Sequence, residues 1–154
     1  MELEYFKETC REYKLRLTPQ RIAIYEAIIQ SQSHPTTEMV YRKVKNVFSN
    51  ISFNTVHQTL LTFTELRLVD LVEGFGTPRR FDPNLDDHHH FYCMVCGKIV
   101  DFNSKLYNNL PDPEQMGNGF VITRKRVVIS GICRKCQDQN KKKMNSRILD
   151  IKEV

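Results

Sequence analysis

Apolar residues recur at intervals of three and four along most of the first half of the chain, with polar residues between them. This period predicts helices, and the breaks in it separate four segments. The four predicted helices cover residues 4–15, 19–30, 37–47 and 52–66. Three of them start beside side chains that can accept hydrogen bonds from the first turn: Thr18 with Pro19 after it, Thr36 or Thr37, and Ser52.

The fourth predicted helix carries a stripe of apolar side chains that we expect to be buried, namely Phe53, Val56, Leu60 and Phe63. Two short runs follow it, residues 68–72 and 79–82, on either side of a glycine-containing loop, and this pattern predicts a β-hairpin. Helices followed by a hairpin are the order of a winged helix-turn-helix domain, in which residues 52–66 would be the recognition helix.

The second half of the chain changes to short runs typical of strands. We expect strands at residues 91–93, 98–102, 120–122 and 127–129, and a short helix at 104–110. We place a domain boundary near Pro83. The fold class is then α+β, with a winged-helix DNA-binding domain in residues 1–83, a small α/β domain in 84–140 and a flexible basic tail in 141–154.

Composition and charge narrow this picture only a little. The 154 residues are 40 % hydrophobic and suit one or two small domains, and no apolar run is long enough to cross a bilayer. The acidic N-terminus lacks the pattern of a signal peptide, so we expect a cytoplasmic protein with no membrane partner. The net charge of +5 comes mostly from the tail around residues 141–143, and charge alone does not identify a nucleic-acid binder.

Four of the five cysteines form two C-x-x-C pairs, and Cys10 is left over as an ordinary helix cysteine. The pairs are Cys93 with Cys96 and Cys133 with Cys136. Each spacing lets both thiolates of a pair face one ion, and four thiolates form the closed tetrahedral set of a structural Zn²⁺ site. We expect Gly97 to adopt a positive φ in the first turn. Two disulfides or two redox dithiols are the alternatives.

A second possible ligand set contains only nitrogen and oxygen donors: His34, Asp82, His88, His90 and Asp101. On an extended strand His88 and His90 share one face while His89 points away. Such a set suits Fe²⁺, Mn²⁺ or Zn²⁺. Histidines near acidic residues are also typical of a solvated loop, and the local sequence leaves both interpretations open.

Several ordered motifs resemble the ferric uptake regulator (Fur) superfamily over roughly residues 10–137. They are residues 17–21 (LTPQR), 33–36 (SHPT), 54–56 (NTV), 88–102 (HHHFYCMVCGKIVDF) and 133–136 (CRKC). The resemblance implies a metal-dependent transcriptional repressor that is not an enzyme. It implies a homodimer, formed through the second domain, on pseudo-palindromic double-stranded operator DNA.

Within the superfamily the chain is most similar to the PerR branch, which senses peroxide. The resemblance implies that His34, Asp82, His88, His90 and Asp101 hold regulatory Fe²⁺ or Mn²⁺. It also implies that peroxide treatment of the iron form oxidises His34 or His88. Asp101 favours this branch, because iron-uptake members usually have Glu there. A further metal site of many iron-uptake members is expected to be absent, since His89, Asn108 and Arg124 or Lys125 stand at its ligand positions.

Two departures from the family pattern bear on DNA binding. His57 stands where Tyr is common, which leaves the base preference open, and Arg67 stands where Gly is common, which predicts a different exit from the recognition helix. That helix has no Lys or Arg, so phosphate contacts must come from elsewhere. The candidate phosphate contacts are Lys14, Arg16, Arg21, Arg79 and Arg80. The candidate base contacts are Asn54, Thr55, His57 and Gln58.

Three other functions are compatible with parts of the pattern. A regulator of iron, manganese or zinc uptake in the same superfamily would bind metal without sensing peroxide. An iron-dependent oxygenase can use two histidines and one carboxylate as a facial triad. A zinc-stabilised interaction module would need only the four cysteines.

Overall fold

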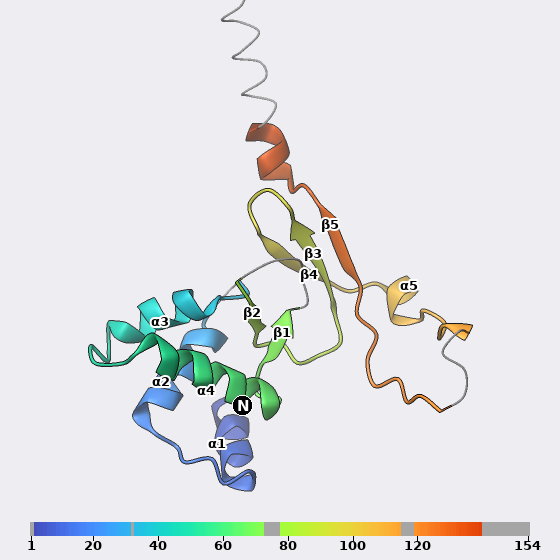
Figure 1. The fold of residues 1–154 in the computed structure, drawn as a ribbon. Helices are drawn as coiled ribbons and strands as arrows, with labels where there is room; N and C mark the ends of the chain where they lie inside the picture. Colours follow the sequence, from blue (N-terminus) through green and yellow to red (C-terminus); the bar gives the residue numbers. More distant parts are fainter. Residues whose placement is uncertain (1, 32, 73–77, 115–118, 140–154) are drawn as a thin grey trace, which may run out of the picture. The chain divides into compact units, whose positions relative to one another are not determined.

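The computed structural model describes residues 2–31, 33–72, 78–114 and 119–139. The chain divides into two compact units, one ending at Asp86 and the other beginning at Asp87 (Figure 1). The first unit contains α1 (Glu2–Glu12), α2 (Pro19–Ile29), α3 (Thr37–Lys45), α4 (Phe53–Glu65), β1 (Asp70–Val72) and β2 (Arg80–Asp82). The order of four helices and a hairpin agrees with the sequence pattern.

Side-chain caps begin three of the helices in the first unit. The Thr18 hydroxyl oxygen accepts a hydrogen bond from Arg21 N at 3.3 Å at the start of α2. Thr36 does the same for Met39 N at 3.3 Å in α3, and Ser52 for Thr55 N at 3.0 Å in α4. These caps satisfy N–H groups that have no partner within the helix, and the three predicted caps are confirmed.

The core of the first unit is built around three aromatic rings from three helices. Phe6 of α1 stacks on Tyr25 of α2 with ring centroids 4.1 Å apart, and Phe63 of α4 meets both rings edge-on. Val56 and Leu60 are also fully buried, so most of the predicted stripe on α4 lies in the core. Phe53 is the exception, because 44 % of its surface remains exposed at the first position of the helix.

The exit from α4 corrects one prediction. Arg67 N donates to the Thr64 carbonyl oxygen and Leu68 N to the Phe63 carbonyl oxygen, which is the Schellman arrangement that usually places glycine at this position. Arg67 adopts it at φ +53°. Arg67 therefore ends α4 in the conformation that favours glycine, at a cost in backbone strain.

The hairpin that follows α4 is antiparallel, with Leu71 opposite Phe81. Its first strand is shorter than predicted, because the N–H groups of Leu68 and Val69 both donate to the Phe63 carbonyl oxygen at the end of α4. Residues 73–77 of the loop expected at its tip lie outside the described residues. Strand β2 also bonds to the segment before α3. Phe81 N donates to the Pro35 carbonyl oxygen, and Thr36 forms an isolated antiparallel β-bridge with Arg80.

The second unit contains β3 (His89–Cys93), β4 (Ile99–Phe102), α5 (Lys105–Asn108) and β5 (Val128–Gly131), followed by helical residues 134–139. The sheet order is β4-β3-β5, with β3 antiparallel to β4 and parallel to β5. The strand predicted at residues 120–122 is wrong. These residues pair with no strand in the described part of the chain, and Phe120 and Val121 remain exposed. Within the described residues, no helix is both long and apolar enough to span a membrane.

Candidate metal centres

The parallel pairing of β3 with β5 brings the two C-x-x-C motifs together. Cys93 is the last residue of β3 and lies opposite Gly131 of β5, so Cys133 follows two residues beyond its register partner. Met94 N donates to the Gly131 carbonyl oxygen at 2.9 Å, and Cys133 N donates to Cys93 Sγ at 3.3 Å. Gly97 closes the first turn at φ +68°, as predicted.

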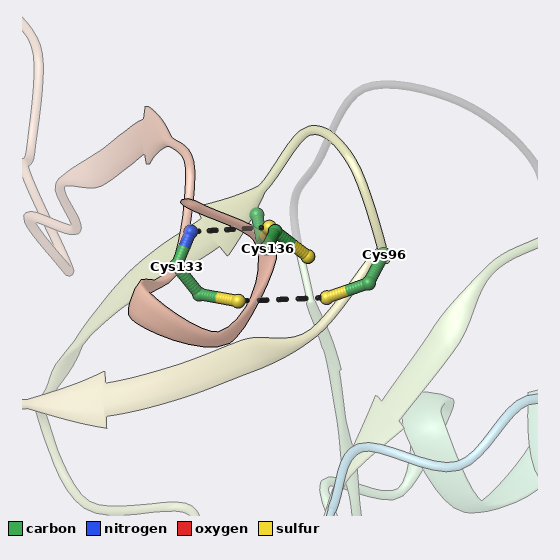
Figure 2. A group of neighbouring side chains, drawn as sticks. Cys96, Cys133 and Cys136 are labelled. Atoms are coloured by element: carbon green, nitrogen blue, oxygen red, sulfur yellow. Dashed lines mark hydrogen bonds between the residues drawn. The ribbon is translucent and has the colours of Figure 1, made fainter. Parts of the chain in front are cut away.

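The four thiols lie in one cluster, with all four Sγ atoms within 4.8 Å of one another. Figure 2 shows the sulfurs of Cys96, Cys133 and Cys136 directed toward a common point. The Sγ atoms of Cys96 and Cys133 are 3.8 Å apart, far beyond a disulfide bond of about 2.05 Å. A zinc–sulfur bond of about 2.3 Å gives sulfur–sulfur edges of about 3.8 Å in a tetrahedron. The cluster therefore has the dimensions of a closed four-thiolate zinc site.

The thiols of this cluster differ in their pKa values. Hydrogen bonds from the backbone N–H groups of Cys133 and Cys96 lower the pKa of Cys93 to about 6. Burial, followed by hydrogen bonds to the other thiols, raises the pKa of Cys136 to about 12. Cys93 can thus present a thiolate at neutral pH, whereas Cys136 must lose a proton when a cation binds.

In the first unit, His34 and Asp82 form a buried pair. His34 Nε2 lies 3.5 Å from Asp82 Oδ2, and both residues are almost fully buried. The backbone bond between Phe81 and Pro35 holds the His34 turn against β2, and Arg80 Nη1 donates to the His34 carbonyl oxygen at 3.0 Å. The Asp82 carboxylate also accepts a hydrogen bond from Asn84 N at 2.9 Å.

In the second unit, His88, His90 and Asp101 converge on one face of the sheet. His90 of β3 lies opposite Asp101 of β4, and their Nε2 and Oδ1 atoms are 3.5 Å apart. His88 immediately precedes β3, and its Nε2 lies 2.9 Å from His90 Nε2 and 4.0 Å from Asp101 Oδ1. Both imidazoles are buried, whereas Asp101 is partly exposed. Two imidazole nitrogens and a carboxylate directed to one point fit a divalent Fe, Mn or Zn ion.

His89 points to the opposite face of the sheet, as alternation along a strand requires. Its Nδ1 accepts a hydrogen bond from Val127 N at 3.2 Å, which leaves the proton on Nε2 to be donated to Asn108 Oδ1 at 2.8 Å. Arg124 and Lys125, one of which is expected at a ligand position of the further metal site, both have acidic partners. Arg124 Nε lies 3.2 Å from Asp87 Oδ1, and Lys125 forms an ion pair with Asp112.

The candidate base-contacting residues differ in the exposure of their side chains and in the contacts that these side chains already make. Asn54 and Gln58 are exposed on α4, and Thr55 is exposed while its hydroxyl is 2.8 Å from the Ser52 hydroxyl. His57 is half-buried, with its Nδ1 3.3 Å from Thr37 Oγ1.

The candidate phosphate contacts also differ. Lys14, Arg16 and Arg79 are exposed. The guanidinium of Arg21 donates to the Arg16 carbonyl oxygen at 2.6 Å, and that of Arg80 donates to the His34 carbonyl oxygen. Arg80 thus supports the turn that carries a proposed metal ligand.

Sequence reasoning overlooked two features of the α3–α4 region. The last turn of α3 carries Arg42, Lys43 and Lys45, which add basic groups to the first unit. Their run of charge in the sequence was the available signal. Phe53 was assigned to the core on its spacing alone, and only its place at the very start of α4 could have suggested otherwise.

Residues 12–130 match the family model described as the Ferric uptake regulator family, so the chain belongs to this family. It is therefore a metal-responsive transcriptional regulator in class, with a Fur-like α+β fold. A peroxide-responsive repressor PerR of Staphylococcus aureus (strain Mu50) is 36 % identical over 138 residues, which are 90 % of this chain and 93 % of the relative.

Many solved structures share the fold, among them the following two. The ferric uptake regulator Fur of Helicobacter pylori, described as having three functional metal binding sites, has a TM-score of 0.73 at 20 % identity, covering 88 % of this chain and 91 % of that one. PerR from Streptococcus pyogenes, described in terms of peroxide sensing and gene regulation, has a TM-score of 0.50 at 29 % identity, covering 87 % and 92 %. These likenesses confirm the predicted α+β fold class.

Proposed function

We propose that the protein is a metal-dependent repressor that binds double-stranded, pseudo-palindromic operator DNA as a homodimer and releases it when peroxide oxidises a ligand histidine. The observation that carries this proposal is the placement of Asp101 within 4.0 Å of the Nε2 atoms of both His88 and His90. The similarity to the Staphylococcus aureus peroxide-responsive repressor supports it. Such a protein works in the compartment that holds the DNA, which we take to be the cytoplasm.

The four cysteines are proposed to hold a structural zinc ion. Their closed set leaves no open coordination position, and its sulfur spacing fits the ion. Zinc there would clamp the end of β3 to the segment after β5. Its role is to stabilise the second unit, which we propose forms the dimer.

The regulatory ion, Fe²⁺ or Mn²⁺, is proposed to take its ligands from both units. His34 and Asp82 come from the first, and His88, His90 and Asp101 come from the second. An ion held by all five favours one arrangement of the units over all others. Metal binding then shifts the population toward the DNA-binding form by its difference in affinity for the two states.

The peroxide response is proposed to reside in the histidines. The chemistry that bound Fe²⁺ would supply is the reduction of peroxide to a short-lived oxidant beside the ligands. The imidazole of His34 or His88 gains one oxygen atom from peroxide, and the other oxygen leaves as water. An oxidised ring is a poorer ligand, so the two units lose their shared ion and the DNA is released. The thiols of a closed zinc site are poor targets in comparison with free thiolates.

Helix α4 is proposed as the recognition helix, with Asn54, Thr55, His57 and Gln58 facing base edges. Phosphates would be contacted by basic side chains outside this helix: Lys14, Arg16, Arg21, Arg79 and Arg80. Replacing Gln58 should change the preferred sequence, whereas replacing Arg79 should weaken binding to all sequences alike.

The test compares the iron-loaded and manganese-loaded proteins on DNA selected from a random pool. Peroxide should abolish DNA binding by the iron form, leave the manganese form unchanged, and add one oxygen atom to a peptide that contains His34 or His88. Loss of DNA binding with every histidine peptide at its original mass would contradict the histidine chemistry.

The second candidate is a metal-uptake regulator of the same family, favoured if the iron form keeps its DNA in peroxide. The variant Asp101→Glu provides the matched comparison. We expect it to retain metal-dependent DNA binding and lose the peroxide response. If Asp101→Glu and the unmodified protein respond equally to peroxide, Asp101 is not what distinguishes a peroxide sensor from a metal-uptake regulator.

A further inference from the structure

Phe53 stands out on α4 because it is a large apolar side chain left in solvent. Its helical spacing places it on the same stripe as Val56, Leu60 and Phe63, yet those three are fully buried and Phe53 is 44 % exposed. It is the first residue of α4, directly after the Ser52 cap, and it is exposed although Ile51 before it and Val56 after it are both buried. The hydrophobic stripe does not account for a phenylalanine here.

The ring of Phe53 is held in place by neighbours on two helices. Tyr41 of α3 meets it edge-on with centroids 5.7 Å apart, and His57 lies nearly parallel to it at 6.3 Å. His57 is in turn fixed by the contact of its Nδ1 with Thr37 Oγ1 at the start of α3. The exposed face of Phe53 is therefore presented by a packed aromatic group, which lowers the entropy cost of using it in binding.

The surroundings of Phe53 indicate what it could contact. Its neighbours on the exposed face of α4 are the polar residues Asn54, Thr55 and Gln58, which suit the hydrogen-bonding edges of bases. The floor of the major groove offers one apolar group, the C5 methyl of thymine, and phenylalanine can pack against it.

We propose that Phe53 is a specificity-determining residue that packs against the C5 methyl group of a thymine in each operator half-site. This inference rests on the proposed function, in which α4 enters the major groove. Tyr41, His57 and Thr37 act as positioning residues, because they hold the ring without forming this contact themselves.

The experiment uses the full-length manganese-loaded protein and a duplex selected by it from a random pool. Each thymine is replaced by deoxyuridine, which removes the methyl group and keeps the base pair, symmetrically in both half-sites. At one position this replacement should weaken binding about fourfold per methyl group, because burying one methyl group contributes about 0.8 kcal/mol. The readout is the dissociation constant measured by fluorescence anisotropy.

Phe53→Ala should bind the unmodified duplex more weakly and lose the penalty at that one position. Phe53→Leu should keep part of the deoxyuridine penalty, because leucine is apolar and can still pack against a methyl group. Leucine also has a high helix propensity, so α4 should be preserved. Tyr5→Ala is the matched control, since Tyr5 is an aromatic residue of the same unit with 46 % exposure on α1, and it should keep the full penalty.

The outcomes separate the inference from the proposed function. If the manganese form selects no sequence from the pool, the proposed function fails. If it selects a sequence but tolerates deoxyuridine everywhere, or if Phe53→Ala and Phe53→Leu both keep the full penalty, the role of Phe53 is overturned. The deoxyuridine series on the unmodified protein finds the contacted methyl group, and Phe53→Leu assigns it to Phe53 even if Phe53→Ala does not fold.

Discussion

The cysteine cluster and the nitrogen–oxygen ligand set differ in where their members come from. All four thiols belong to the second unit, and the pairing of β3 with β5 brings them within 4.8 Å of one another. The proposed nitrogen–oxygen ligands are divided, with His34 and Asp82 in the first unit and three more in the second. A set inside one unit can stabilise that unit, whereas a divided set can report on how the units are arranged.

The largest expected effect comes from breaking the cysteine cluster. Cys96→Ser should abolish zinc binding and unfold the second unit, because a structural zinc site contributes about 10 kcal/mol or more to folding. The first unit has its own core and should keep its helices. Metal analysis and circular dichroism measure the two results. Cys10→Ala is the control and should retain one zinc per chain, and full zinc content in Cys96→Ser would show that the cluster is not the site.

A weaker effect should follow from changing the divided set. Asp101→Asn removes a carboxylate ligand and should lower the manganese affinity by about 100-fold, or about 2.7 kcal/mol, with zinc content unchanged. Calorimetric titration with Mn²⁺ measures the affinity. Asp87→Asn, a nearby exposed carboxylate, should leave it unchanged. Equal losses in the two variants would mean that overall charge, rather than coordination, controls the affinity.

A change in the first unit that touches neither ligand set should affect stability alone. Arg67→Gly relieves the positive φ at the end of α4 and should raise the free energy of unfolding by about 1 kcal/mol. Denaturant unfolding measures it. Glu65→Gly, two positions earlier inside the helix, should lower the same free energy by about 1 kcal/mol. Destabilisation by Arg67→Gly would mean that the arginine side chain contributes more than its backbone strain costs.

The smallest expected effect concerns the fifth cysteine. Burial raises the pKa of Cys10 above its ordinary value, and Arg21 opposes the shift. The folded state therefore binds the thiol proton more tightly than the unfolded state. This contribution to stability is complete below the unfolded pKa of about 8.5 and decreases as pH rises above it. Unfolding between pH 8 and pH 10 should show a steeper loss of stability in the unmodified protein than in Cys10→Ala, and parallel curves would refute this assignment.

Features that depend on neighbours in the sequence were predictable, and features that depend on distant packing were not. Thr18 and Ser52 cap helices because their side chains reach N–H groups three residues away. Gly97 has the positive φ that its place in a C-x-x-C turn requires. The assembly of two such motifs could be predicted from ligand chemistry, but the parallel pairing that accomplishes it could not.

The wrong predictions have the same origin. Residues 120–122 have the composition of a strand, but a strand also needs a hydrogen-bonded neighbour, and these residues pair with no strand in the described part of the chain. Phe53 fits the buried stripe by spacing, but its ring packs against Tyr41 and His57 and stays 44 % exposed, whereas Val56 in the same turn is fully buried. Arg67 stands at a position that favours glycine, yet it takes the positive φ and completes the backbone hydrogen bonds at the end of α4.

The parallel pairing of β3 with β5 also has a consequence for the folding rate. Its register joins His90 to Val128 and Phe91 to Ile129, so the chain between them must close into a long loop before any of these contacts form. Loop closure of this kind costs entropy early and slows folding. In the first unit, by contrast, α2 packs on α3 and α3 on α4, neighbours along the chain. We therefore expect the helical unit to fold first, and the thiols to capture zinc only after the last strand has returned to the sheet.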